Sequence, residues 1–135
     1  MHPHNLVILV TLLSILLYFF MILRVGAARG KSGIEAPAVT GDPVFERTYR
    51  VQMNTLEQLP VYLVSLWVFT AFWDQRIAAA AGAVWIVGRL IYLMSYVKDP
   101  KTRSLGFGIS GIAVVVLFVG AVWGVVKALI ATGGV

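Results

Sequence analysis

The chain has 135 residues, of which 59% are hydrophobic and 13% are charged, and its net charge is +5. A soluble domain carries about 25% charged residues, so this composition excludes a water-soluble globular fold and predicts a protein surrounded by lipid. The chain contains no cysteine, which excludes disulfides and cysteine-bound metals. Any thiol chemistry therefore requires a thiol brought by a ligand.

Four apolar segments are each long enough for a helix of about 20 residues, the length that crosses the hydrocarbon core of a bilayer. The alternation of apolar and polar residues that is typical of a membrane β-barrel is absent. We therefore predict an all-α fold, in which residues 1–135 form one domain, an integral membrane four-helix bundle. The predicted helices cover about residues 5–25, 43–73, 77–98 and 104–131.

Glycine and proline residues mark the predicted helix ends. The segment Gly26–Asp42 is rich in both, and we interpret it as a loop. Pro43 suits the first turn of the second helix, with Asp42 as its N-cap. In the fourth helix, Gly120 and Gly124 form a small-xxx-small pair, which allows another helix to approach closely.

The basic residues predict the orientation of the chain in the membrane. They lie in or beside the first and third connections: Arg24, Arg29, Lys31, Arg47 and Arg50, then Lys98, Lys101 and Arg103. By the positive-inside rule, we expect these two connections on the cytoplasmic face and both termini on the opposite, non-cytoplasmic side. His2 and His4 are too few ligands for a closed metal site, so we predict no metal. We also expect no nucleic-acid partner.

Two rows of polar side chains interrupt the apolar pattern. The second helix carries Glu46, Arg50, Asn54 and Glu57, at spacings that place them on one helix face. The third helix carries Arg89, Tyr92 and Tyr96, and Arg103 follows shortly after it. An arginine inside a membrane helix requires a carboxylate or another acceptor, and Glu46 and Glu57 are candidate partners of Arg89. Ion pairs between helices would explain Arg89 alone, but the excess of arginines indicates an anionic ligand.

The segment Phe45–Glu57 (FERTYRVQMNTLE) resembles the signature of the membrane-associated proteins in eicosanoid and glutathione metabolism. This family includes the microsomal glutathione transferases and leukotriene-C4 synthase. The run Arg89-Leu90-x-Tyr92-x-x-x-Tyr96, with Arg103 seven residues on, resembles the third helix of the family. The resemblance covers essentially the whole chain. It implies a homotrimer that binds glutathione between adjacent subunits, near the cytoplasmic face.

The resemblance also implies which residues form the site. One subunit would supply Arg50, Asn54, Glu57, Arg89, Tyr92 and Tyr96. Its neighbour would supply Arg29 and Gln52, and Arg103 matches the arginine that contacts the glutathione sulfur, which makes it the predicted catalytic residue. Gln58 occupies a position at which a tyrosine packs against glutathione, and Gly30 a position at which leukotriene-C4 synthase has a second arginine. These two differences argue against leukotriene synthesis.

The chemistry of the ligand agrees with these roles. Guanidinium groups bind carboxylates in a forked geometry, Glu57 suits the ammonium group of glutathione, and a cation beside a thiol favours the reactive thiolate. We therefore predict a membrane-bound glutathione transferase or peroxidase. Its thiolate would attack a lipophilic electrophile or hydroperoxide that is dissolved in the membrane lipid.

Two other interpretations remain open at this point. A small multidrug-type transporter also has four short helices and a glutamate in the membrane, although three arginines would repel cationic drugs. A non-catalytic membrane scaffold would bind lipid or an anionic metabolite. Glutathione binding without turnover would favour the scaffold.

Overall fold

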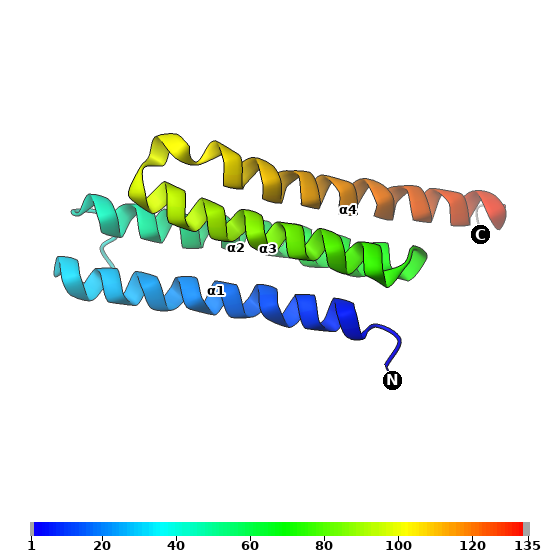
Figure 1. Ribbon diagram of the computed structural model, residues 1–135, viewed down its shortest axis with the longest axis horizontal. Helices are drawn as coiled ribbons and strands as arrows, with labels where there is room; N and C mark the ends of the chain where they lie inside the picture. Colours follow the sequence, from blue (N-terminus) through cyan, green and yellow to red (C-terminus); the bar gives the residue numbers. More distant parts are fainter. Residues whose placement is uncertain (1, 134–135) are drawn as a thin grey trace.

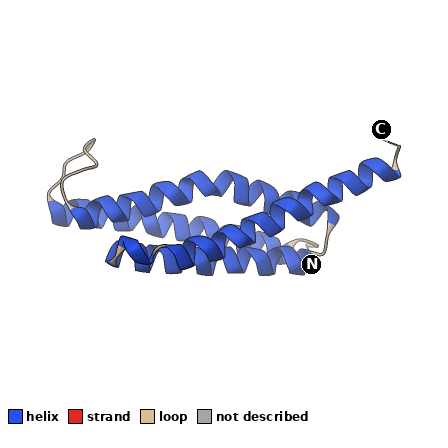
Figure 2. Ribbon diagram, turned by 90° about the horizontal axis from the view of Figure 1, so that it is seen from above, coloured by secondary structure: helices blue, strands red, loops and turns tan. Residues whose placement is uncertain are grey.

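The computed structural model describes residues 2–133, and every segment of regular structure in this range is helical (Figure 2). The long helices are α1 (Asn5–Ser32), α2 (Pro43–Phe72), α3 (Gln75–Lys98) and α4 (Ser104–Ala131), and the short 3₁₀ turn η1 (Pro100–Thr102) precedes α4. The predicted all-α fold is therefore confirmed.

The helices α2 and α3 each pack against both α1 and α4. The helices α1 and α4 lie on opposite sides of this central pair (Figure 1). The α1–α2 and α3–α4 connections lie together at one end of the bundle, and the two ends of the described chain lie at the other. We name the first the basic end, because most of the cations lie there: Arg29, Lys31, Arg47, Arg50, Lys98, Lys101 and Arg103.

The end of α1 differs from the prediction. The segment expected to begin a loop at Gly26 stays helical as far as Ser32, so the connection to α2 covers only residues 33–42. The helix ends where Gly33 adopts a φ of 73° and its N–H donates to the carbonyl oxygen of Arg29. A glycine inside a helix costs only about 1 kcal/mol relative to alanine, which the neighbouring alanines and the membrane environment offset.

The starts of α2 and α3 are set by aspartates. Pro43 begins α2 and the side chain of Asp42 caps it, as predicted. Helix α3 begins at Gln75, two residues earlier than predicted. The reason is that the Asp74 side chain accepts a hydrogen bond from the backbone N–H of Arg76 at 2.8 Å, so only Trp73 and Asp74 lie between α2 and α3.

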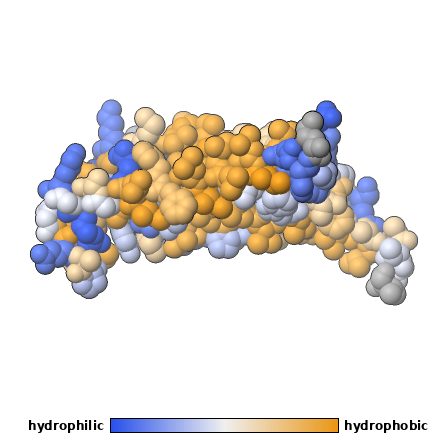
Figure 3. All heavy atoms as spheres, turned by 90° about the horizontal axis from the view of Figure 1, so that it is seen from below, coloured by the Kyte–Doolittle hydropathy of each residue, from blue (hydrophilic) through white to orange (hydrophobic). Residues whose placement is uncertain are grey.

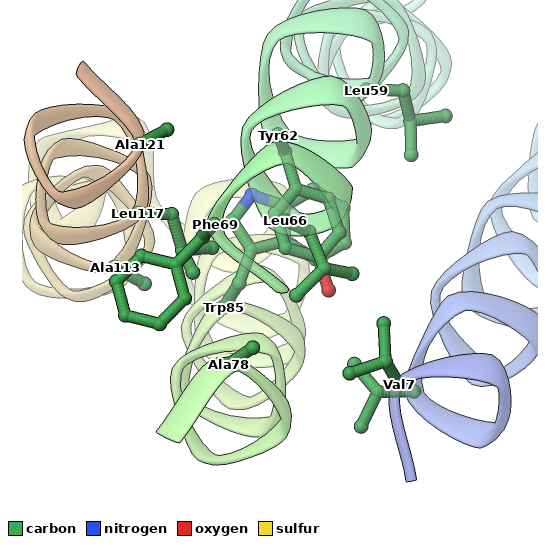
Figure 4. Packing of buried hydrophobic residues seen from close by; sticks show 11 residues of the cluster. Val7, Leu59, Tyr62, Leu66, Phe69, Ala78, Trp85, Ala113, Leu117 and Ala121 are labelled. Carbon is green, nitrogen blue, oxygen red and sulfur yellow. The ribbon is translucent and has the colours of Figure 1, made fainter. Parts of the chain in front are cut away.

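One aromatic stack and one hydrogen bond join three helices in the centre of the bundle. Tyr62 of α2 and Trp85 of α3 are fully buried, and their rings stack with centroids 4.0 Å apart. The Tyr62 hydroxyl shares a 2.8 Å hydrogen bond with the Ser14 hydroxyl of α1. Leu66 and Leu117 pack in the same cluster (Figure 4). Stacked aromatic pairs contribute about 0.5–1.5 kcal/mol beyond the area they bury, so this contact fixes the relative positions of α1, α2 and α3.

Close packing between α2 and α4 uses the predicted glycine pair. A Cβ atom at Gly120 would lie 2.4 Å from the side chain of Phe69, and one at Gly124 would lie 2.6 Å from the side chain of Phe72. Both glycines therefore receive an aromatic side chain of α2. The small-xxx-small pair serves a contact within the chain.

The surface has the character of a membrane protein. All four long helices have the length and the apolar composition that a membrane span requires. A broad apolar band covers the middle of the molecule and separates two more polar ends (Figure 3). Leu23, Met94 and Ile130 are 72%, 72% and 74% exposed, an arrangement that water would disfavour and lipid tolerates. The chain is therefore an integral, multi-pass membrane protein.

Candidate functional site

A cavity of about 360 Å³ lies toward the basic end of the bundle, between α2, α3 and the start of α4. Its lining residues are Arg50, Asn54, Tyr92, Tyr96, Arg103, Ser104 and Phe107. All of these except Ser104 and Phe107 belong to the site predicted from the sequence. A cavity of this size falls within the usual range for small-molecule sites, about 300–1,000 Å³.

Helical spacing explains why these side chains meet. Arg50 and Asn54 are one turn apart on α2, and Tyr92 and Tyr96 are one turn apart on α3. The two tyrosine rings lie with their centroids 5.3 Å apart. The turn η1 reverses the chain after α3, so that Arg103, immediately before α4, returns to the same cavity.

The electrostatics of the cavity favour an anion. Arg50 and Arg103 bring two guanidinium groups to its wall, and no lining residue within the described part of the chain is acidic. Both arginines are exposed in the isolated chain. The tyrosine hydroxyls and the Asn54 amide add neutral hydrogen-bonding groups. The cavity can therefore hold a small, polar, negatively charged ligand.

Arg89 lies behind the cavity wall and is fully buried. Its guanidinium donates to Asn54 Oδ1 at 2.7 Å, to Thr55 Oγ1 at 3.4 Å and to Ser110 Oγ at 2.9 and 3.2 Å. The expectation that Glu46 or Glu57 pairs with Arg89 is therefore wrong. Both glutamates are exposed, and neutral oxygens inside the bundle satisfy the guanidinium instead.

Two glycines bring α4 close enough to reach Arg89. A Cβ atom at Gly106 would lie 2.3 Å from the backbone nitrogen of Tyr92, and one at Gly88 would lie 2.6 Å from the backbone nitrogen of Ser110. Only residues without a side chain allow this backbone contact. The contact places the Ser110 hydroxyl within hydrogen-bonding distance of the guanidinium.

Two of the predicted ligands lie away from the cavity in this chain. The guanidinium of Arg29 donates to the carbonyl oxygen of Ala38 at 2.8 Å and lies over the ring of Phe45. The amide of Gln52 donates to the hydroxyl of Tyr18 on α1 at 3.1 Å. Both therefore lie on the α1 side of α2, whereas the cavity lies between α2, α3 and α4.

Two further predicted ligands also lie outside the cavity lining. Glu57 is exposed, on the same face of α2 as Asn54. Gln58 is directed into the bundle, where its amide oxygen accepts a hydrogen bond from the indole N–H of Trp85 at 3.3 Å. This contact ties Gln58 to the central aromatic stack.

Sequence reasoning did not identify Thr55, Ser104, Phe107 or Ser110 as neighbours of the site. For Ser110 a signal was present, because Gly106 and Ser110 form a small-xxx-small pair at the start of α4. That pattern resembles the Gly120 pair, and only the packing of α3 against α4 shows that it adjoins a buried arginine. The other three have no distinguishing sequence pattern.

The chain matches the MAPEG family over residues 7–123. An uncharacterized protein of Synechocystis sp. is 44% identical over 113 residues, which cover 84% of this chain and 82% of the relative. Microsomal glutathione S-transferase 2 of Homo sapiens is 38% identical over 113 residues, 83% of this chain and 77% of the relative. Leukotriene C4 synthase of Bos taurus is 39% identical over 94 residues, 70% of this chain and 63% of the relative. Because the match runs from α1 into α4 and includes the helices that form the cavity, the chain belongs to the MAPEG family.

Proposed function

We propose that the protein is a membrane-bound glutathione transferase or peroxidase that acts on lipophilic electrophiles or hydroperoxides. The observation that carries the proposal is the cavity lined by Arg50, Arg103, Asn54 and two tyrosines, to which residues 2–133 contribute no acidic side chain. The relatives named as a glutathione S-transferase and as leukotriene C4 synthase support glutathione as the anionic ligand.

In this proposal each polar group of the cavity meets a complementary group of glutathione. Arg50 and Asn54 bind a carboxylate of the tripeptide, because guanidinium and amide N–H groups are its natural donors. Tyr92 and Tyr96 line the cavity from α3. Arg103 lies beside the sulfur and stabilises the thiolate, and is the catalytic residue because it contacts the reacting atom.

The chemical step is nucleophilic attack by the thiolate. In conjugation, the sulfur forms a bond to an electrophilic carbon, and the leaving group departs with the electron pair of the bond that breaks. In an epoxide, the ring oxygen keeps this electron pair and is then protonated. In peroxide reduction, the sulfur attacks the terminal oxygen and the O–O bond breaks. The alkoxide leaves with the electron pair of that bond and is protonated to the alcohol. A second glutathione then reduces the resulting sulfenic acid, giving glutathione disulfide and water.

The site is completed by a neighbouring subunit in a homotrimer. Arg29 and Gln52 lie on the α1 side of α2, away from the cavity of their own chain, which supports their supply to the cavity of an adjacent subunit. Arg89 acts from behind the wall, and Glu57 lies at the subunit boundary, where it meets the ammonium group. Gln58 remains a structural partner of the aromatic stack.

The orientation in the membrane follows from the charge distribution. Both basic connections lie at the same end of the bundle (Figure 1), which supports a cytoplasmic location for this end under the positive-inside rule. The termini then lie on the non-cytoplasmic side. Glutathione enters from the cytoplasm, and the lipophilic co-substrate reaches the thiolate from the lipid.

Conjugation of glutathione with a chlorinated nitrobenzene by the purified protein tests the proposal. We expect a glutathione-dependent increase in absorbance of the conjugate, and reduction of a lipid hydroperoxide is the parallel assay. Tight glutathione binding without turnover of any electrophile or hydroperoxide would indicate a scaffold. The absence of both glutathione binding and turnover would refute the proposal.

Replacing Arg50 with alanine is expected to weaken glutathione binding by about tenfold, because a charge-assisted hydrogen bond to the ligand is lost. Calorimetric titration of the purified protein measures this change. Lys31→Ala removes a cation from the same end of the bundle but not from this cavity, and is expected to leave the affinity unchanged. Equal losses in the two variants would contradict the assigned cavity.

A further inference from the structure

The Arg89 guanidinium is a buried positive charge whose hydrogen-bond acceptors are all neutral. Within residues 2–133, its acceptors are the side chains of Asn54, Thr55 and Ser110. Its exposed fraction is 0%. A buried charge without an opposite charge destabilises the folded chain, so its presence requires an explanation beyond packing.

The position of this charge supplies the explanation. The central carbon of the guanidinium lies 4.5 Å from the ring centroid of Tyr92 and 5.9 Å from that of Phe107. Both rings, together with Asn54, line the cavity. Arg89 is therefore separated from the cavity by a single layer of side chains, and its field acts on whatever occupies the cavity.

Asn54 is the direct link between this charge and the cavity. Its amide oxygen accepts a hydrogen bond from Arg89 Nη1 at 2.7 Å. An amide has one acceptor end and one donor end. Because the oxygen faces Arg89, the two N–H groups of Asn54 are not engaged by the guanidinium, and the residue lines the cavity. They are therefore available to a carboxylate there.

Ser110 fixes the guanidinium from the opposite side. Its hydroxyl donates to the backbone carbonyls of Gly106 and Phe107, at 3.1 Å each. With its proton engaged, its lone pairs accept from Nε and Nη2 of Arg89 at 3.2 and 2.9 Å. Ser110 therefore holds the guanidinium plane in the orientation that presents Nη1 to Asn54.

We propose that Arg89 and Ser110 are positioning residues for the carboxylate of the ligand, and that neither touches it. Ser110 orients Arg89, Arg89 orients the amide of Asn54, and the carboxylate supplies the negative charge that the partners of Arg89 within residues 2–133 do not provide. This inference rests on the proposed function, because it takes glutathione as the anion. The buried charge of Arg89 destabilises the unliganded chain, and ligand binding offsets this loss of stability.

Asn54→Asp tests the inference through two properties that should change in opposite directions. A carboxylate at this position pairs with Arg89, so the thermal midpoint of the unliganded protein in detergent should rise. The same change removes the N–H donors and repels the anion, so the dissociation constant of glutathione should increase by about tenfold or more. A lower midpoint together with unchanged affinity would overturn the inference.

Ser110→Ala tests whether Ser110 positions the guanidinium of Arg89. It should lower the thermal midpoint, because two N–H groups of Arg89 lose their acceptor. It should also raise KM for glutathione by about tenfold while leaving kcat nearly constant, which is the pattern for lost ground-state binding. Ser65→Ala is the matched control, since Ser65 is also buried but lies two turns or more from the site on α2. A lower midpoint with an unchanged KM would overturn the positioning role.

The combined variant Asn54→Asp/Ser110→Ala separates this inference from the proposed function. The new carboxylate should restore much of the thermal stability that Ser110→Ala loses, but not the affinity for glutathione. Failure of this rescue would reject the link between Arg89 and Asn54. By contrast, an unaltered protein that does not bind glutathione at all would reject the proposed function, while the stability measurements would still report on the buried charge.

Discussion

Replacing Gly106 with alanine is expected to destabilise the protein and to weaken glutathione binding in the same step. The added Cβ atom would lie 2.3 Å from the backbone nitrogen of Tyr92 and 2.7 Å from the carbonyl oxygen of Gly88. These are backbone atoms, so no side-chain rotation relieves the clash, and α3 and α4 must separate. Overpacking of this kind costs about 1–3 kcal/mol, and we expect the upper part of that range.

The loss of binding follows from the same displacement. Moving α4 away from α3 withdraws Ser110 from Arg89 and shifts Phe107 and Arg103, which line the cavity. Thermal unfolding in detergent, with and without glutathione, measures both effects. We expect a lower midpoint and a smaller increase of that midpoint when glutathione is added.

Gly111→Ala is the control for this prediction. Gly111 lies on the same helix, and an added Cβ atom would have no neighbour within 4 Å. Alanine is the better helix former by about 1 kcal/mol, so this variant should be unchanged or slightly more stable. Equal destabilisation by the two substitutions would mean that α4 does not depend on the close contact with α3.

Arg103→Ala is expected to raise the pKa of bound glutathione and so to remove most of the thiolate at neutral and acidic pH. An ordinary thiol has a pKa of about 8.5, and a nearby guanidinium that lowers it by about two units stabilises the thiolate by roughly 2.7 kcal/mol. At pH 6.5 the thiolate fraction would then fall from about one half to about 1%, a loss of roughly 50-fold.

The conjugation rate should fall by less than the thiolate fraction. A thiolate of higher pKa is the stronger nucleophile, with a Brønsted slope of about 0.4–0.5, so we expect a decrease in rate of roughly five- to eightfold at pH 6.5. The deficit should shrink as the pH rises and be reversed above about pH 9, where glutathione is deprotonated in both proteins and the thiolate of the variant is the stronger nucleophile.

Ultraviolet absorbance of the thiolate, titrated against pH for the bound ligand, measures the pKa directly. Lys101→Ala is the matched control, because Lys101 is an exposed cation two residues away that does not line the cavity. Glutathione bound to this variant should have the same thiol pKa as glutathione bound to the unaltered protein. A rate deficit for Arg103→Ala that is constant across pH would show that Arg103 does not act on the sulfur.

The same few contacts hold the bundle together and shape its site. The meeting of α3 and α4 at Gly88 and Gly106 is a packing contact, and it also places Ser110 beside Arg89. A change in this contact therefore alters stability and ligand binding together. The aromatic stack of Tyr62 and Trp85 lies outside the cavity lining and contributes to the scaffold on which the site is built.

The sequence by itself determined the membrane character, the helix count and the residues on the two polar helix faces. These properties depend on composition and on the spacing of residues along one helix, which the chain order specifies directly. The residues that line the cavity from α2 and α3, Arg50, Asn54, Tyr92 and Tyr96, share faces for this reason. The extension of α1 to Ser32 was missed because glycine disfavours a helix only weakly and its neighbours outweigh it.

Only the tertiary structure decided which groups satisfy Arg89 and which predicted ligands stay apart. A charge pattern suggests carboxylate partners, but the partners of a buried guanidinium depend on how closely two helices approach. Here two glycines bring Ser110 within 2.9 Å of the guanidinium, and the glutamates remain on the surface. Likewise, helical spacing fixes the positions of Arg29 and Gln52 along their own helices. It does not show that both lie on the α1 side of α2, because that arrangement depends on the packing of α1 against α2.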